Sequence, residues 1–269
     1  MSVESFKKEL WETALLESYK GITLAEVITR KPTSVEGKCA HFNSASVSGD
    51  LRDYTGTVVY DNIDTTGIDL LYDKKIYKAP VLDDVDAAQL SADVMMPVID
   101  NISYEIKKSI DKALFAEAVL NASVDNVIGS TSAKESVTTA EQAYDLIVDL
   151  GTKLDEKDVP TTGRYVIASP AFVNLLAKDK RVIDNAAVLP SGIVQGMEVN
   201  GMQIIKTNNA PANQIIALHN QAIGYGKQID KMEALRLENA FADAIRTLVV
   251  YGVKTLQPEG IAVLNYEIA

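Results

Sequence analysis

The chain has 269 residues, of which 47% are hydrophobic and 23% are charged, and its formal net charge is −11. This length and composition are those of a globular protein with one large domain or two small ones, and they exclude a disordered chain. The negative charge argues against a protein whose main role is to grip nucleic-acid phosphates, although an acidic protein could still surround DNA and leave it mobile.

Residues 3–20 are predicted to form a short amphipathic helix, with Phe6, Leu10 and Trp11 on its apolar side. The stretch has no uninterrupted apolar core and no small-residue cleavage site, so it does not fit a signal peptide. Two roles stay open for this helix: it packs on its own domain, or it is an arm that packs on a neighbouring subunit. The stretch 22–27 that follows is predicted to be extended.

Residues 39–81 have the pattern of a long hairpin. Strand-like pieces (TVVY, IDLL and KIYKAPV) alternate with the turn compositions SGD, DNIDTTG and YDKK. Such a segment has few large apolar residues and cannot bury much surface alone, so it lies along its own domain or reaches another subunit. Cys39 and His41 would point the same way on a strand. Nothing in the sequence supplies an orienting group or an oxyanion site beside them, and we interpret them as ordinary strand residues.

The hairpin is followed by a cluster of aspartates, Asp83, Asp84 and Asp86, ahead of the helix-forming run VDAAQLSADVMM. Clustered carboxylates can hold a metal or share a proton. At a helix start they also accept hydrogen bonds from the unpaired amides of the first turn, and Asp86 stands where a capping-box acid would stand. We favour structural helix caps at Asp83 and Asp86, with a metal site as the alternative. The metal signatures HExxH, CxxC and the EF-hand loop are absent from the sequence.

A second, longer helix is predicted to begin near Pro97 and to end near Asn121. Its apolar residues recur every four positions: Val98, Ile102, Ile106, Ile110, Leu114 and Ala118. The opposite, solvated side carries charged residues: Asp100, Glu105, Lys107, Lys108, Asp111 and Lys112. This helix is expected to be a structural spine.

Beyond the spine, residues 126–228 are predicted to form an α/β layer around a central sheet. Thr139 and Gln142 indicate a capping box, Ser169 and Pro170 the start of another helix, and Asn200–Gly201 a hairpin turn. QIIALHNQAIGYG is predicted to be a further strand pair, and its GYGK lacks the glycine spacing of a phosphate loop. Residues 247–256 are expected in a long β ribbon, and QPEG precedes a final strand.

This order of elements resembles the major capsid proteins of tailed bacteriophages with the HK97 fold. The strings SPAFVNLLAKD, IIKTNN and YGVKTLQPEGIAVL carry the resemblance most specifically. It implies an α+β fold made of an N-arm, an extended E-loop hairpin, a P-domain (spine helix and β ribbon) and an A-domain (central sheet flanked by helices). The implied divisions are 1–37 for the N-arm, 38–82 for the E-loop region, 83–125 for the spine helix, 126–228 for the A-domain, 229–258 for the ribbon and 259–269 for the final A-domain strand.

The same resemblance implies a non-enzymatic shell protein without cofactor or metal, which assembles as hexamers and pentamers into an icosahedral head around double-stranded DNA. Assembly would take place in the host cytoplasm, with a separate scaffolding protein and a portal, without sequence-specific DNA contacts and without a membrane. Inter-subunit contacts are expected from two sets of residues: Asp50, Arg52, Asp53, Tyr54, Asp61 and Asp64 of the E-loop, and Phe6, Leu10 and Trp11 of the N-arm. The alternatives are an encapsulin-type nanocompartment shell and a small-molecule α/β enzyme, the latter disfavoured because no catalytic set is apparent.

Overall fold

The computed structural model describes residues 23–47, 52–54, 56, 58, 60, 63–83, 95–179, 181, 187–188 and 193–268. Its helices are α2 (Leu24–Ile28), α4 (Met95–Leu120), α5 (Ala140–Asp155) and α6 (Pro170–Leu176), with 3-10 turns η1 (Val124–Asn126) and η2 (Pro258–Gly260). Its strands are β1 (Ser34–Glu36), β2 (Cys39–Val47), β3 (Ile63–Leu71), β4 (Lys74–Lys78), β5 (Val81–Asp83), β6 (Val127–Ile128), β7 (Glu135–Val137), β8 (Arg164–Ala168), β9 (Ala187–Val188), β10 (Ile193–Val199), β11 (Met202–Lys206), β12 (Gln214–His219), β13 (Ile223–Arg236), β14 (Ala242–Thr255) and β15 (Ile261–Ile268).

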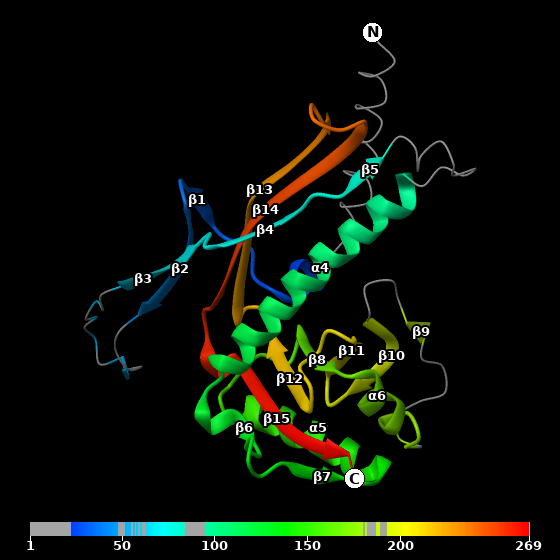
Figure 1. Ribbon diagram of the computed structural model, residues 1–269. Helices are drawn as coiled ribbons and strands as arrows, with labels where there is room; N and C mark the ends of the chain where they lie inside the picture. The colour runs from blue at the N-terminus through cyan, green and yellow to red at the C-terminus, as the bar shows by residue number, and fades with distance from the viewer. Residues whose placement is uncertain are drawn as a thin grey trace.

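Figure 1 shows how these elements are arranged: α4 runs along a β ribbon, a mixed sheet lies at one end of α4, and a hairpin leaves the body to one side. The ribbon consists of β13 and β14, and both β4 and β5 pair with β14. The mixed sheet has the order β6-β15-β12-β8-β11-β10-β9, with β7 also paired to β15. The fold is therefore α+β, with its strands divided between separate sheets.

The spine helix α4 is confirmed, at a length of about 39 Å for its 26 residues. Pro97 lies in its first turn, where the missing amide costs no intrahelical bond. The predicted apolar row is buried from Ile102 to Ala118, whereas Val98 is only partly buried and its neighbour Ile99 lies in the core. Asp111 was wrongly placed on the solvated side, since its exposed fraction is 5%. The reason is tertiary: the ribbon and α2 both contact α4, and Asn209 of the loop after β11 also reaches Asp111.

The local signals for α5 and α6 are confirmed. The Thr139 hydroxyl accepts from the Gln142 amide at 3.3 Å, and the Gln142 side chain accepts from the Thr139 amide, which completes the capping box. The Ser169 hydroxyl accepts from the Phe172 amide at 3.4 Å, with Pro170 at the first helical position. Each of these contacts joins residues that are close in sequence, so the sequence alone was enough to predict them.

The turn predicted at Asn200–Gly201 is also confirmed. Both residues have positive φ, 50° and 71°, as a two-residue hairpin turn between β10 and β11 requires. The second strand pair was wrong. β12 pairs with β8 and β15, whereas β13 pairs with β14, so the two strands that flank the Asn220–Gln221 turn enter different sheets. A turn signal says that the chain reverses but not which sheet receives the next strand.

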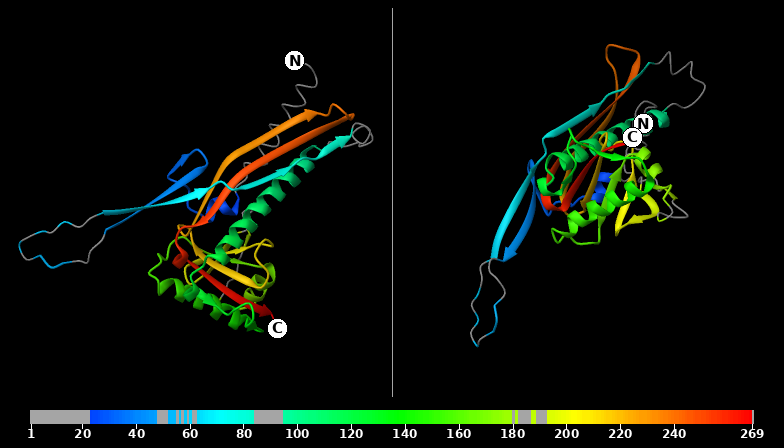
Figure 2. Two further views of the ribbon diagram at one scale, coloured as in Figure 1. Left: turned by 60° about the vertical axis from the view of Figure 1, so that its left-hand side comes forward. Right: turned by 90° about the horizontal axis from the view of Figure 1, so that it is seen from below.

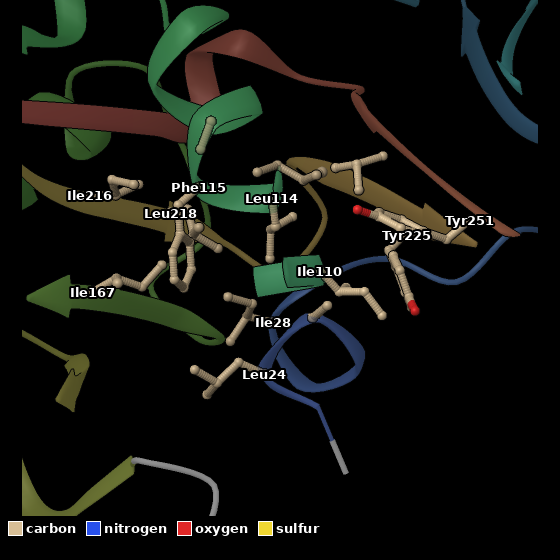
Figure 3. Packing of buried hydrophobic residues seen from close by; sticks show 14 of the residues in the cluster. Leu24, Ile28, Ile110, Leu114, Phe115, Ile167, Ile216, Leu218, Tyr225 and Tyr251 are labelled. Carbon is tan, nitrogen blue, oxygen red and sulfur yellow. The ribbon is translucent and has the colours of Figure 1, made fainter. Parts of the chain in front are cut away.

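The extended structure predicted for residues 22–27 was wrong as well. Residues 24–28 form α2, which begins with the Thr23 hydroxyl accepting from the Glu26 amide at 3.3 Å. Leu24, Ala25 and Ile28 are buried in the core that surrounds α4. Tertiary burial of one helical face thus overrides the local preference. Figure 3 shows Leu24 and Ile28 beside Ile110 of α4.

Two large apolar clusters hold the body together. One joins α2, α4, the ribbon and one face of the mixed sheet, where Phe115 of α4 packs near Ile167, Ile216 and Leu218 (Figure 3). The other lies between the opposite face of that sheet and helices α5 and α6. Because α4 shares a core with both the ribbon and the sheet, it fixes the position of one relative to the other.

Candidate assembly surfaces

The hairpin of β2 and β3 leaves the body after a short base. The two strands pair in unbroken register from Cys39 with Leu71 to Val47 with Ile63. The base is buried in a small cluster made of Ala40, Phe42, Leu70, Tyr72 and Val250. Figure 2 shows strands β2 and β3 extending away from the rest of the molecule. None of the described side chains of residues 52–60 belongs to the two large cores.

Several of the predicted contact residues of the hairpin can be placed. Arg52, Asp53 and Tyr54 are exposed, and the exposed fraction of Tyr54 is 78%. Tyr60, in a stretch predicted to be strand, has irregular backbone and is 91% exposed. Asp64 lies in β3 opposite Ser46. Asp50 and Asp61 lie outside the described residues. The described part of the tip thus presents aromatic side chains to solvent. An isolated subunit does not need these exposed rings for its own stability.

Three glycines form a saddle on which the base of the hairpin rests: Gly224, Gly226 and Gly252. A Cβ at Gly252 would lie 2.4 Å from the Leu71 carbonyl oxygen, and one at Gly224 would lie 2.6 Å from the Phe42 ring. A Cβ at Gly226 would lie 2.8 Å from the Tyr72 hydroxyl. Gly224 and Gly226 of the GYGK string are therefore packing positions for the base of the hairpin.

Polar contacts also fix the base of the hairpin and the strand that follows. The Lys254 ammonium donates to the Asp69 carbonyl oxygen at 2.8 Å, and the Gln228 side chain donates to the Gly37 carbonyl oxygen. Lys78 of β4 pairs with Glu105 of α4 and so ties the returning chain to the spine helix. Exposed pairs add little stability.

The Cys39–His41 pair lies on the exposed face of β2. The Nδ1 atom of His41 lies 2.6 Å from the Oδ1 atom of Asp69, which is the residue directly opposite His41 on β3. Asp69 is an orienting group that sequence spacing could not identify, because it lies 28 residues away along the chain. The contact between His41 and Asp69 joins the two strands of the hairpin. Among the described residues, no group of three or more His, Cys, Asp and Glu side chains is placed to hold a metal ion.

The ribbon carries a second exposed surface, which we call the ribbon outer patch: Tyr77, Lys231, Glu233, Arg246 and Leu248. Register brings these residues together, because Leu248 of β14 lies between Lys231 of β13 and Tyr77 of β4, and Arg246 lies opposite Glu233. Tyr77 is 80% exposed and Leu248 is 38% exposed, although the alternate residues Thr247 and Val249 are buried. The patch combines an apolar row with charged neighbours, as many protein interfaces do.

Glu233 is the acidic centre of the ribbon outer patch. Lys231 and Arg246 donate to its carboxylate, and these hydrogen bonds lower the pKa of Glu233 to about 2. The Lys231 ammonium lies 2.9 Å from Oε1, and the Arg246 guanidinium contacts Oε2. Glu233 is therefore ionised at neutral pH and holds Lys231 and Arg246 beside it.

The remaining predicted site residues fall at or beyond the edge of the described chain. Phe6, Leu10 and Trp11 lie outside it, as does Asp86. Asp83 is the last residue of β5 and pairs with Ala242, but the residues that would form the capped helix lie outside the described ranges. The capping of this helix stays a prediction. In the described part of the chain, no helix has the length and apolarity that crossing a membrane requires.

The sequence reasoning missed the ribbon outer patch and the glycine saddle. No single strand carries a signal for the patch, because its residues come from β4, β13 and β14 and only the sheet register brings them together. Phe241, at the end of the ribbon, is 82% exposed and was missed too. The saddle could not be predicted, because a glycine within a strand indicates that another segment packs closely but does not identify that segment.

Comparisons with known proteins agree with this geometry. A family model described as phage capsid protein matches residues 72–264. A solved structure from Mycobacterium phage Che8 superposes with a TM-score of 0.71 at 26% identity, over 91% of each chain. The capsid structure of the cyanophage P-SCSP1u gives a TM-score of 0.71 at 18% identity, over 92% of this chain and 89% of the other. A search of curated protein sequences found no match.

A virus-like particle from Pyrococcus furiosus has the same fold, with a TM-score of 0.60 at 16% identity over 96% of this chain and 99% of that one. The fold alone therefore does not separate a phage head from other shells, whereas the family match does. The matched family is structural and non-enzymatic. The predicted HK97-like α+β fold and the virion location are confirmed. The chain belongs to the phage capsid protein family and is a major capsid protein that forms the icosahedral shell of a phage head.

Proposed function

We propose that the subunits associate as hexamers and pentamers and that each hairpin extends over the adjacent subunit. The observation that carries this proposal is the hairpin itself, which has a buried base and an exposed tip with aromatic residues such as Tyr54 and Tyr60. A long, mostly polar projection adds little to the stability of a monomer. Overlap with a neighbour would cover its open strand edges, which otherwise invite aggregation.

The ribbon outer patch is the surface that we assign to receive the hairpin tip. Residues 48–64 contain four aspartates and one arginine, so the tip is acidic. The patch is basic, since Lys231 and Arg246 outweigh Glu233, and Lys75 lies two residues before Tyr77 on the same face of β4. Its apolar row of Tyr77 and Leu248 suits the tyrosines of the tip. Complementary charge of this kind sets the register of an interface and suppresses wrong partners.

Within the subunit, we assign the regions as the family resemblance implies. Residues 1–37 are the N-arm, 38–82 the E-loop region, and 83–125 together with 229–258 the P-domain. The A-domain is 126–228 with the final strand 259–269. The shared core around α4 supports the pairing of the spine helix with the ribbon. We assign the contacts of Phe6, Leu10 and Trp11 to a neighbouring subunit.

The interior of the shell holds double-stranded DNA without sequence-specific contacts. The net charge of −11 supports this assignment, because an acidic wall repels the phosphate backbone and leaves the DNA mobile. Assembly in the host cytoplasm with a separate scaffolding protein and a portal completes the proposal. Repulsion between acidic subunits is the physical reason for a partner that guides assembly.

The test is to replace residues 48–62, which follow β2 and precede β3, with a short Gly-Ser turn. The variant is expected to stay folded, with circular dichroism and thermal melting close to those of the unmodified subunit, because the removed part lies largely outside the two main cores. It is expected to form no closed particles in sedimentation and electron microscopy. Normal particles from this variant would show that the hairpin is not an inter-subunit element, and an unfolded variant would show that it belongs to the core.

A further inference from the structure

A buried carboxyl group, Asp111, lies where three segments of the chain meet. It belongs to α4 and is 5% exposed. Ala25 of α2 and the side chain of Asn209 in the loop after β11 lie beside it and favour its ionised form. Figure 3 shows the apolar side of the same junction, where Leu24 and Ile28 of α2 pack beside Ile110. Asp111 therefore joins α2 to the spine helix and to the mixed sheet.

The hydrogen bonding of this junction is incomplete when Asp111 is ionised. The Oδ1 atom of Asp111 and the Oδ1 atom of Asn209 are both buried, and neither has a hydrogen-bond partner within the described residues. Both atoms are acceptors, and an unpaired buried acceptor costs free energy. A proton on Asp111 would turn one acceptor into a donor and would remove a buried charge. The geometry of the junction thus favours the neutral acid.

The charged groups around the junction come from each neighbouring element. Lys107 lies one turn before Asp111 on α4, and its charge also interacts with Glu26 of α2, Asp100 of α4 and Lys227 of β13. The loop of residues 207–213 has no titratable side chain. Lys107 favours the ionised form of Asp111, but burial is the larger effect and raises the pKa of Asp111 to about 6.

The direction of the pH effect follows from this raised pKa. When α2 leaves α4, the carboxyl group becomes hydrated and regains its ordinary pKa of 3.8. The closed junction therefore binds the proton more tightly than the open one does. The stability that this proton adds to the docked state of α2 is complete below the ordinary pKa of Asp111. It is lost as the pH rises through the range from 3.8 to about 6.

We propose that Asp111 makes the docking of α2 on the spine helix sensitive to pH, so that α2 is held in acid and is released more readily at neutral pH. Release of α2 would let the chain before Thr23 move farther from the body. The consequence for the shell rests on the proposed function, in which residues 1–37 are an arm that contacts a neighbour. Neutral conditions would then favour exchange of the arm between subunits, and acid would favour the arm held by its own subunit.

The test is hydrogen–deuterium exchange of the α2 amides in the unassembled full-length subunit at pH 5 and pH 7.5. After correction for the pH dependence of intrinsic exchange, opening of α2 should be about tenfold more frequent at pH 7.5, as the two pKa values of Asp111 require. Asp111→Asn keeps the size of the side chain but cannot ionise, and its α2 exchange should show no such change. Because the measurement uses single subunits, it does not depend on whether the arm contacts a neighbour.

Two further variants separate this effect from other titrations. Glu26→Gln removes an exposed acid of α2 itself and should keep the tenfold change. Lys107→Gln removes the cation that favours ionised Asp111, so the midpoint of the change should move to higher pH. The proposal is overturned if the wild-type subunit shows no corrected pH dependence at α2. It is also overturned if Asp111→Asn retains that dependence, or if Glu26→Gln abolishes it.

Discussion

Gly226 and Gly252 lie directly opposite each other in the ladder between β13 and β14, and the base of the hairpin packs against both. Tyr72 covers Gly226, and Leu70 and the backbone of Leu71 cover Gly252. Side chains at either position would hold the hairpin away from the ribbon. The orientation of the hairpin thus depends on the lack of side chains at Gly226 of β13 and Gly252 of β14, which are far from the hairpin in sequence.

Gly252→Ala tests this relationship. Its Cβ would lie 2.4 Å from the Leu71 carbonyl oxygen, and a backbone atom cannot move aside cheaply. We expect a loss of about 1 to 3 kcal/mol in the free energy of unfolding, measured by urea denaturation, as for other overpacked sites. Gly67→Ala is the matched control, because only the Asn43 side chain lies near, at 4.0 Å. Equal effects of the two variants would show that the saddle is not a close contact.

Arg164 is expected to be a main support of the mixed sheet. Its side chain is almost fully buried, and its guanidinium donates to the Pro160 carbonyl oxygen at 2.8 Å, to the Val159 carbonyl oxygen and to Asp155 at 2.7 Å. Arg164→Ala removes a buried side chain and its hydrogen bonds to the half-buried Val159 and the exposed Pro160, and it should cost about 2 to 3 kcal/mol of unfolding free energy.

The control for Arg164 is Asp155→Asn, which removes the charged partner but keeps both carbonyl contacts. Since the Asp155 side chain is 51% exposed, its loss should cost less than about 1 kcal/mol. Urea denaturation of the two variants gives the comparison. If Asp155→Asn cost as much as Arg164→Ala, the ion pair and not the carbonyl contacts would be the main interaction.

Tyr77→Asp should leave the subunit folded and block particle formation. Tyr77 is 80% exposed, and substitutions at such sites usually change stability by within about 0.5 kcal/mol. In the proposed interface, however, the new carboxylate would face an acidic hairpin tip. Tyr77→Phe keeps the ring and should assemble normally, as electron microscopy of both variants would show. Normal particles from Tyr77→Asp would remove the ribbon outer patch from the interface.

Particle formation should also depend on ionic strength. Subunits with a net charge of −11 repel one another, and salt screens this repulsion. Light scattering across a salt series should show assembly promoted by salt, or by a basic scaffolding partner at low salt. Spontaneous assembly that is fast at low ionic strength and indifferent to salt would contradict this expectation.

How far the sequence could predict this molecule depended on the range of each interaction. The apolar row of α4, the capping box at Thr139 and the turn at Asn200 involve residues a few positions apart, and all three predictions were confirmed. The helical state of residues 24–28 and the burial of Asp111 depend on segments that meet only in the folded chain. Periodicity on one helix cannot show that a second element covers its polar side.

The assembly surfaces divide in the same way. The hairpin could be expected from its turn residues and its scarcity of large apolar side chains, and its exposed tip follows from the same composition. The ribbon outer patch could not, because Tyr77, Lys231 and Leu248 come from three strands that only the sheet register brings together. A surface made by pairing between distant strands has no signature within any one of them.

The most direct test of the account is an electron cryomicroscopy map of the assembled shell, at a resolution that traces the hairpin. We predict that residues 48–64 of each subunit lie over the ribbon outer patch of an adjacent subunit, with Tyr54 or Tyr60 against Tyr77 and Leu248. A map in which the hairpin folds back on its own subunit, or in which the patch faces solvent without a covering chain, would contradict it.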